Sequence, residues 1–338
     1  MLLIDKYTPT SPDQLIFHKE LFEKLLKISQ DDSIPHILFY GPPESGKKTI
    51  IRFFLEAIFD KSVNKLSPTT YEIKTTNSTT TKEVVVQQSN HHIVIEPNNN
   101  NYDRHLIQDV VKSYARLKPM NVFTAKRNFK MVLINNIDNL TYYAQTSLRR
   151  TMEKYSSTCR FIMWCRSLSK ILDPLISRCL CIRVPAPTDQ QILRLMMDVS
   201  VMEKIKLSFD DYYEIRVAAK NRINKTFHLL EWKKAGIDNS NSFDTVIDDI
   251  ANHIINGKNT NELMIIRTLL YQITVTNISG TIIIRNLLDK LLELIVDDNI
   301  KYEIINYAAE YEHRLVKGRR EIIHLEGFIN MVFCKLRS

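Results

Sequence analysis

The chain is poor in glycine, with 7 glycines among its 338 residues. Soluble proteins contain roughly 7% glycine, so a glycine motif in this chain is rarely a matter of chance. Two of the seven, Gly41 and Gly46, lie close together in the sequence. They therefore single out one short segment as a candidate functional loop.

Long hydrophobic runs and paired cysteines are also missing. No uninterrupted apolar run approaches the roughly 18 residues of a membrane-spanning helix, and charge appears within Met1–Lys6, so we expect neither membrane insertion nor secretion. The 5 cysteines form no CxxC pair and no nearby histidine completes a zinc site, so no metal site is predicted. Their odd number indicates a reducing compartment.

Acidic residues do not balance the basic ones, and the formal net charge is +8. Two segments carry the excess: residues 101–130 contain seven Lys or Arg and two acids, and residues 149–183 contain eight and two. Such a concentrated positive field favours a polyanionic partner, DNA or RNA first and an anionic membrane second. The alternative is a solvated basic face without a partner.

Short apolar runs alternate with helical patterns over the first half of the chain. Strand-like runs occupy 36–40, 71–73, 83–88, 93–95, 130–134, 160–165 and 180–184, and helical periodicity occupies 19–29, 50–59, 103–117 and 144–155. Strands alternating with helices imply a mostly parallel sheet covered on both faces. Part of residues 69–96 is predicted to form a long β-hairpin that projects from this domain.

Strand patterns nearly vanish after Pro185 and Pro187. Helical periodicity follows over 189–204, 209–219 and 224–235, and it resumes over 243–338. The sequence thus predicts an α/β plus all-α fold, with an α/β domain at 1–186, a small helical domain at 187–240 and a second helical domain at 243–338.

Gly41–Thr49 contains the pattern G-x4-G-K between a predicted strand and a predicted helix. In such a loop, backbone N–H groups and the helix N-terminus cradle phosphates while Lys47 meets their charge. The next position normally supplies a hydroxyl group to Mg²⁺, but here it is Lys48, and Thr49 follows one residue later. We therefore expect a bound nucleotide, impaired hydrolysis and a compromised Mg²⁺ site.

Three further segments carry a resemblance to a known family. Leu140–Tyr155 contains A-Q-x-x-L-R-R-T-M-E-K-Y, Arg160–Cys165 reads RFIMWC, and Ile176–Cys179 reads ISRC. These segments resemble the small subunits of replication factor C, the sliding-clamp loader of the AAA+ class. The resemblance extends over essentially the whole chain, from Asp5–Pro9 to His324–Phe328.

The resemblance implies an architecture and a set of partners. The α/β domain would be an AAA+ nucleotide-binding domain with a hairpin insertion, followed by a helical lid and a collar domain for oligomerisation. The implied partners are other replication factor C subunits, the PCNA sliding clamp and primer-template DNA. The implied location is the nucleus, or a replication compartment for a viral source.

Within the family, the chain most resembles the subunit whose own ATPase site is degenerate. The metal-binding Asp and the catalytic Glu of the family fall on Asn135 and Asn136, so only Asp138 remains of that acidic stretch. The sensor-1 Asn falls on Arg166 and the sensor-2 Arg on Asn224. An amide is a poor Mg²⁺ ligand and cannot act as a general base, so no hydrolysis in cis is expected.

The resemblance also implies which residues bind ATP or ADP. Tyr7 and Pro9 would pack near the adenine. The phosphate-loop residues implied to contact the nucleotide are Gly41, Pro42, Gly46, Lys47, Lys48 and Thr49.

Arg178 differs from these positions because its S-R-C motif is intact. The resemblance implies that this arginine reaches the γ-phosphate held by the neighbouring subunit, as an arginine finger. The alternative is that Arg178 pairs with a local carboxylate.

The basic helix at 103–117 corresponds in the family to a region that follows the DNA backbone. The implied phosphate contacts are Arg104, Lys112, Arg116 and Lys118. The hairpin at 69–96 either reaches toward the clamp or DNA or is a surface insertion without contacts. Two rival functions remain open, an active AAA+ motor and a purely structural nucleotide-binding subunit.

Overall fold

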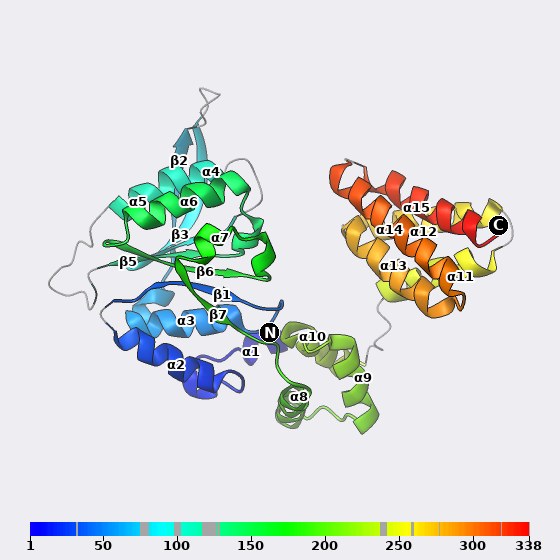
Figure 1. The fold of residues 1–338 in the computed structure, drawn as a ribbon. Helices are drawn as coiled ribbons and strands as arrows, with labels where there is room; N and C mark the ends of the chain where they lie inside the picture. Colours follow the sequence, from blue (N-terminus) through cyan, green and yellow to red (C-terminus); the bar gives the residue numbers. More distant parts are fainter. Residues whose placement is uncertain are drawn as a thin grey trace. The chain divides into compact units, whose positions relative to one another are not determined.

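The computed structural model describes residues 1–31, 33–74, 81–97, 103–116, 127, 129–236, 242–257, 260–276, 278–318 and 320–337. The chain divides into two compact units, Met1–Ile237 and Asp238–Ser338 (Figure 1). The first unit holds all the described strands and the second holds only helices. Within the described ranges, no helix is both long enough and apolar enough to cross a bilayer.

A seven-stranded sheet organises the first unit, in the order β2-β3-β4-β5-β6-β1-β7. The five parallel strands are β4 (His92–Ile95), β5 (Lys130–Ile134), β6 (Cys159–Cys165), β1 (His36–Tyr40) and β7 (Cys179–Arg183). Each of these strands coincides, to within one residue at either end, with an apolar run of the sequence. Because both faces of a parallel sheet are covered, these runs are continuous rather than alternating.

Helices cover both faces of the parallel strands, as Figure 1 shows. On one face, α2 (Lys19–Gln30) and α3 (Lys47–Ile58) pack on side chains such as Ile37 and Phe39, which are completely buried. On the other face lie α6 (Tyr142–Lys154) and the helical segment from Asp103 to Arg116. That segment comprises α4 (Asp103–His105), the π-helical stretch η3 (Leu106–Val111) and α5 (Lys112–Arg116).

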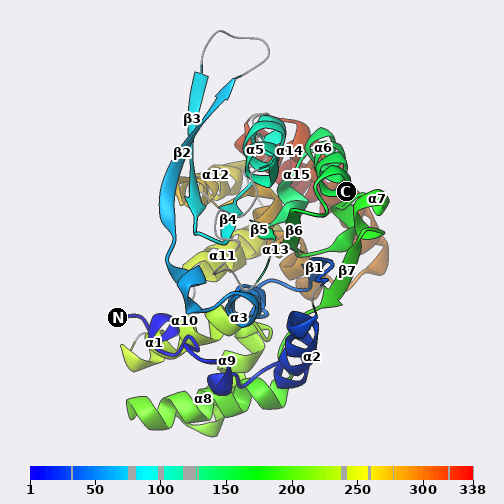
Figure 2. The same cartoon turned by 90° about the vertical axis from the view of Figure 1, so that its left-hand side faces the viewer.

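The hairpin forms the sheet edge, where β2 (Ser67–Lys74) and β3 (Thr81–Gln88) pair antiparallel. Figure 2 shows these two strands extending well beyond the parallel ones. Residues 92–95, which the sequence grouped with the hairpin region, form β4, a strand of the parallel core that pairs with β5. The segment 75–80 between β2 and β3 lies outside the described residues.

Short elements connect these parts of the first unit. They are α1 (Leu3–Lys6), η1 (Pro12–Gln14), η2 (Lys61–Asn64), η4 (Ile137–Asn139), η5 (Leu168–Lys170) and α7 (Asp173–Ile176).

Three helices complete the first unit: α8 (Asp189–Glu203), α9 (Phe209–Ala219) and α10 (Ile223–Lys234). Thr188 and Ser208 begin α8 and α9 with reciprocal capping boxes, so the starts of both helices are encoded locally. Leu3 of α1 is buried among their apolar side chains. The N-terminus of the chain is thereby attached to this helical part, which we call the lid.

The second unit is a helical bundle around its own apolar core. Its helices are α11 (Ser242–Asn256), α12 (Thr260–Val275), α13 (Gly280–Leu294), α14 (Asp298–Lys317) and α15 (Glu321–Lys335). Leu270, Leu287 and Phe328 are completely buried in that core. The aromatic and methionine side chains of this unit thus divide between its core and its surface, where Met264 and Tyr271 are exposed.

Candidate functional site

The glycine loop joins the end of β1 to the start of α3, as the sequence predicts. Gly41 has φ +154° and lies so close to β7 that a Cβ atom there would sit 2.1 Å from the Val184 carbonyl oxygen. Gly46 is the N-cap of α3 with φ 85°, and no side chain caps the helix there. The first N–H groups of α3 therefore remain for an anion, and this geometry fits a phosphate group.

Lys47 is turned back onto its own loop. Its Nζ donates to the carbonyl oxygens of Gly41 at 2.8 Å and Pro42 at 2.6 Å, and the side chain is 5% exposed. Burial is the main reason that the pKa of Lys47 lies below its usual value. An incoming phosphate would have to replace these carbonyl contacts in order to engage the ammonium group.

Five of the residues predicted to bind the nucleotide line one small cavity between the loop and the lid, whereas Gly41, Pro42, Lys47 and Lys48 do not line it. Tyr7, Pro9, Gly46, Thr49 and Asn224 all line it, together with side chains such as Phe17 and Phe227. Its volume is about 130 Å³, whereas ligand pockets usually measure at least roughly 300 Å³. The structure therefore brings these residues together around a space that must widen to admit a nucleoside.

Tyr7 links this cavity to the lid. Its ring stacks on Phe227 with 6.3 Å between centroids, and its hydroxyl group donates to Glu203 at 2.7 Å. Burial, together with this hydrogen bond, raises the pKa of Tyr7 to about 12. Lys6 and Lys234 also contact the Glu203 carboxylate, at 2.6 and 2.7 Å.

The loop itself also contacts the lid, through a residue that sequence reasoning missed. The Glu44 carboxylate accepts a hydrogen bond from the backbone N–H of Lys225 at 3.1 Å, in the first turn of α10. A carboxylate at a helix N-terminus satisfies a backbone donor and interacts favourably with the helix dipole. Glu44 thus joins the phosphate loop to the helix that carries Asn224.

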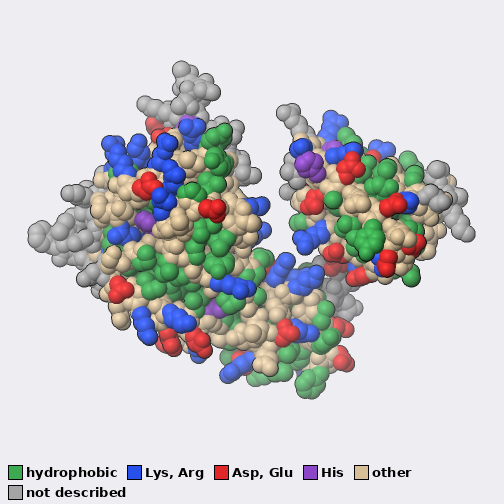
Figure 3. All heavy atoms as spheres, in the orientation of Figure 1, with side chains coloured by type: hydrophobic (Ala, Val, Ile, Leu, Met, Phe, Trp, Pro, Cys, Tyr) green, Lys and Arg blue, Asp and Glu red, His purple; other side chains and the backbone are tan. Residues whose placement is uncertain are grey.

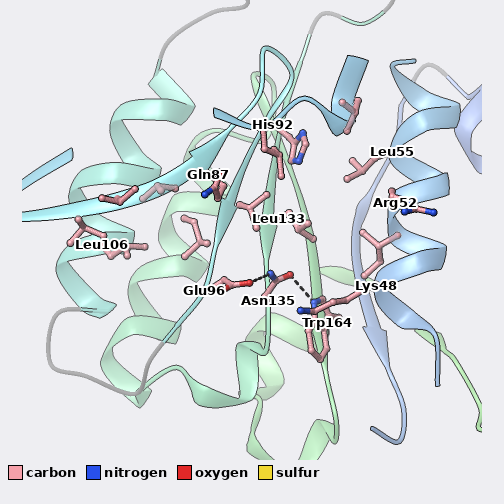
Figure 4. A pocket seen from close by; sticks show the side chains of 18 of the residues that line it. Lys48, Arg52, Leu55, Gln87, His92, Glu96, Leu106, Leu133, Asn135 and Trp164 are labelled. Atoms are coloured by element: carbon pink, nitrogen blue, oxygen red, sulfur yellow. Dashed lines mark hydrogen bonds between the residues drawn. The ribbon is translucent and has the colours of Figure 1, made fainter. Parts of the chain in front are cut away.

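Asn135, which the resemblance predicts to stand in place of a metal ligand, takes part in a hydrogen-bond bridge. Asn135 follows β5 and is 7% exposed. Its Nδ2 donates to Glu96 Oε1 at 2.7 Å, and its Oδ1 accepts from Trp164 Nε1 at 2.8 Å (Figure 4). Both ends of the amide are engaged, so this side chain ties together the ends of β4, β5 and β6.

This bridge lies on a large cavity between α3 and strands β3 to β5. The cavity measures about 960 Å³, and Lys48, Leu133 and Trp164 are among the residues that line it. Lys48 Nζ lies 5.7 Å from the centre of the Trp164 ring, within cation–π range. Lys48, which follows Lys47 of the glycine loop, therefore lies over the Trp164 indole.

Asn136, Asp138 and Arg166 lie at the same end of the sheet and form no acidic cluster. Asn136 adopts a left-handed conformation, with φ 46°, and its Oδ1 has no hydrogen-bond partner among the described residues. Asp138 accepts from the backbone N–H of Arg166 at 3.2 Å. No group of three or more His, Cys, Asp or Glu side chains in the described ranges is placed to hold a metal ion. Asp138 is the carboxylate that remains in this stretch, and its buried Oδ1 has no hydrogen-bond partner among the described residues.

Arg178 lies between α7 and β7, and it has the local carboxylate partner that the sequence left as an alternative. Its Nε donates to Glu153 Oε1 at 2.8 Å, and its Nη2 lies 2.7 Å from the same oxygen. Its Nη1 donates to the Pro174 carbonyl oxygen at 2.7 Å. The Arg178 side chain is still 38% exposed.

Two of the predicted DNA-contact residues line a basic groove between the 103–116 helical segment and α6. Arg104 and Lys112 line it from one side, and Arg150 and Lys154 of α6 line it from the other. Figure 3 shows Lys and Arg side chains gathered over α5 and α6. Arg116 is exposed on α5 but does not line the groove, and Lys118 lies outside the described residues. Arg150 and Lys154 belong to the basic segment 149–183 of the sequence. Only the fold shows that they lie opposite the helical segment 103–116.

Comparisons with known proteins cover both units. A family model described as the C-terminal domain of replication factor C subunit 3 matches residues 243–338, and one described as the delta subunit of DNA polymerase III matches residues 17–188. Human replication factor C subunit 3 is 35% identical over 97% of this chain and 94% of its own length. The chain belongs to the replication factor C family.

Other relatives agree with this assignment. A putative replication factor C small subunit of Acanthamoeba polyphaga mimivirus is 40% identical over 99% of this chain and 91% of its own length. Replication factor C subunit 5 of Oryza sativa subsp. japonica is 33% identical over 97% of this chain and 96% of its own length.

Family membership confirms the fold expected from the sequence, an AAA+ clamp-loader α/β domain followed by helical parts. It also implies that the chain binds nucleotide and assembles with other replication factor C subunits.

Proposed function

We propose that this chain is a catalytically degenerate clamp-loader subunit. It binds ATP or ADP without hydrolysing it, and it supplies Arg178 to the ATP site of a neighbouring subunit. In the assembled complex it helps to place the PCNA sliding clamp on primer-template DNA. The site of action is the nucleus, or a replication compartment if the source is a virus.

The observation that carries the degenerate site is the bridge from Glu96 through Asn135 to Trp164. Phosphoryl transfer in AAA+ proteins depends on a Mg²⁺ ion that offsets charge on the phosphates and on a base that orients water. Asn135 uses its amide for structural contacts, and Asn136 offers no base. The loop can still hold phosphates through the N-terminus of α3, so binding and hydrolysis are separated.

Nucleotide binding and turnover by the purified chain test this proposal together. We expect a bound nucleotide, detected after denaturation or with a labelled analogue, and no Mg²⁺-dependent release of phosphate above background. Lys47→Ala should weaken binding because it removes the ammonium group that meets the phosphate charge. Mg²⁺-dependent turnover that Lys47→Ala abolishes would show an active ATPase and overturn the proposal.

The arginine-finger role is supported by the intact S-R-C motif and by the exposure of Arg178 at the end of α7. An arginine that enters a neighbouring site stabilises charge that develops in the transition state, and removing it typically costs roughly 10³ to 10⁵ in rate at that site. Arg178→Ala should therefore slow ATP turnover by the assembled complex without changing its subunit composition. Unchanged turnover in an intact complex would refute the role.

The DNA contact is supported by the basic groove of Arg104, Lys112, Arg150 and Lys154. Contacts with phosphates depend on charge and not on base sequence, so they should weaken with salt. A complex in which Lys112→Glu and Lys154→Glu are combined should load clamps more slowly. Loading at the normal rate would count against this surface as the DNA contact.

A further inference from the structure

We infer that Glu153 is a positioning residue for Arg178 and fixes the guanidinium group in the orientation that reaches the neighbouring ATP site. This inference rests on the arginine-finger function proposed above and assigns it a second residue of this chain.

One oxygen of Glu153 holds one side of the guanidinium group. Oε1 of Glu153 lies 2.8 Å from Nε and 2.7 Å from Nη2 of Arg178. The Pro174 carbonyl oxygen accepts from Nη1 at 2.7 Å, and the Ser177 hydroxyl group lies 3.3 Å from the same nitrogen. The plane of the group is therefore defined by contacts from two sides.

These contacts do not use all the N–H donors of the guanidinium group. Arginine has five N–H donors. Hydrogen bonds to Glu153, Pro174 and Ser177 use three of them, and Nη2 also lies 2.7 Å from the Glu153 oxygen. The side chain remains 38% exposed, so the remaining N–H of Nη2 can still meet a phosphate oxygen presented from outside the chain. A planar group held in this way is suited to a tetrahedral phosphate because its donors have a fixed spacing.

The turn of α6 that carries Glu153 is anchored in the core, although the Glu153 side chain is itself 45% exposed. Glu153 lies near the end of α6, directly after Met152 and Thr151, which are 1% and 6% exposed and anchor that turn in the core. Arg149 lies one turn earlier, with its Nε 3.9 Å from the same Glu153 oxygen. Ordering a long exposed arginine before assembly reduces the conformational entropy that docking would otherwise cost. Catalytic groups held in this way gain rate through orientation.

The test is a double-mutant cycle in the reconstituted complex of this chain with its partner subunits. Glu153→Gln keeps the shape of the side chain but removes its charge. We expect it to lower kcat by up to about fivefold, the size of a lost exposed ion pair, with little change in the KM for ATP. In the Arg178→Ala background it should cause no further loss, because it acts through that arginine.

Two additional variants keep the test decisive. Glu310→Gln neutralises an exposed acid of a comparable surface pair, with Arg314, in the second unit and should leave turnover unchanged. Glu153→Asp retains the charge at a shorter reach, and it should lower kcat less than Glu153→Gln does. It also serves as the test variant if Glu153→Gln does not assemble.

The outcomes separate the inference from the function on which it rests. Unchanged turnover with Arg178→Ala would overturn both. Slower turnover with Arg178→Ala, combined with unchanged or faster turnover with Glu153→Gln, would overturn only the positioning role; faster turnover would mean that Glu153 holds the arginine back. Equal slowing by Glu153→Gln in the presence and absence of Arg178 would also overturn it.

Discussion

Asn135 follows strand β5 and Arg178 precedes strand β7, and the two side chains differ in how their polar atoms are used. Asn135 is 7% exposed, and both ends of its amide bond to other side chains of the same chain. Arg178 is 38% exposed and keeps an N–H group for a partner. The Asn135 side chain therefore joins parts of this chain, whereas the Arg178 side chain keeps an N–H group that another molecule can reach.

The contacts of Asn135 determine what an aspartate would meet at this position. An aspartate at 135 would place a carboxylate where the amide now donates to Glu96 at 2.7 Å. Two carboxylates at that distance repel each other, and one of them would have to be protonated. The bridge therefore favours asparagine over aspartate at this position.

The largest expected effect concerns the shape of the Arg178 side chain. Arg178→Lys keeps the positive charge but loses the planar fork of donors. We expect it to recover little of the roughly 10³-fold or greater loss caused by Arg178→Ala at the neighbouring site. Single-turnover measurements on the assembled complex give the rate of that step. A lysine variant with a nearly normal rate would show that a positive charge at this position is sufficient. The planar arrangement of the arginine donors would then not be needed.

The next effect tests the structural side of the comparison. Asn135→Asp should lower the free energy of unfolding by about 1 to 3 kcal/mol at pH 7, because a buried hydrogen bond becomes a repulsion. The loss should shrink as the pH falls, since protonating one carboxyl group restores a donor. Denaturant titrations at pH 7 and pH 5 measure both quantities.

A matched double variant provides the control for that prediction. Combining Glu96→Gln with Asn135→Asp exchanges the amide and the carboxylate and restores a donor–acceptor pair between the two positions. It should recover much of the lost stability. A single Asn135→Asp variant as stable as the parent chain would show that the bridge contributes nothing.

A smaller effect concerns the other surface assigned to a partner, the basic groove. Each phosphate contact contributes about 0.9 to the slope of log binding constant against log salt concentration on duplex DNA. Lys112→Ala and Lys154→Ala should each reduce the slope by about one, measured by fluorescence anisotropy of primer-template DNA with the complex. Lys24→Ala, an exposed lysine of α2 on the opposite face of the sheet, should leave the slope unchanged. Equal slopes for all three variants would remove the groove from the DNA contact.

The smallest effect concerns the attachment of the N-terminus to the lid. Contacts from Lys234, Lys6 and Tyr7 lower the pKa of Glu203 from 4.5 to about 2. A lowered pKa in the folded chain means that Glu203 stabilises the fold above pH 4.5, and that this contribution is lost as the pH falls toward 2. Thermal unfolding over this range should decline less steeply for Glu203→Gln than for the parent chain. Parallel curves would show that the contacts of Glu203 do not depend on its charge.

The parallel sheet and the glycine loop could be predicted because their signals are local. Apolar runs mark β1, β5 and β6, and the scarcity of glycine makes the loop conspicuous. The run 93–95 was correctly predicted as a strand, but a short apolar run does not reveal its partners, and β4 pairs antiparallel with β3 on one side and parallel with β5 on the other.

The contacts that define the site could not be predicted in this way. Glu96 and Asn135 are separated by 39 residues, and Arg178 and Glu153 by 25, so their pairing depends on strand order and helix placement. Glu44 contacts Lys225 from 181 residues away. The resemblance implied that Asn135 and Asn136 stand where the family has acidic residues, whereas the structure shows which contacts Asn135 makes.

The central claim is that this chain contributes to catalysis through Arg178 and not through its own phosphate loop. The most direct test compares Lys47→Ala and Arg178→Ala of this chain in the same reconstituted complex, with assembly verified, by steady-state ATP turnover in the presence of clamp and primer-template DNA. We expect turnover close to that of the parent complex for Lys47→Ala and a large loss for Arg178→Ala. A large loss for Lys47→Ala with normal turnover for Arg178→Ala would contradict it.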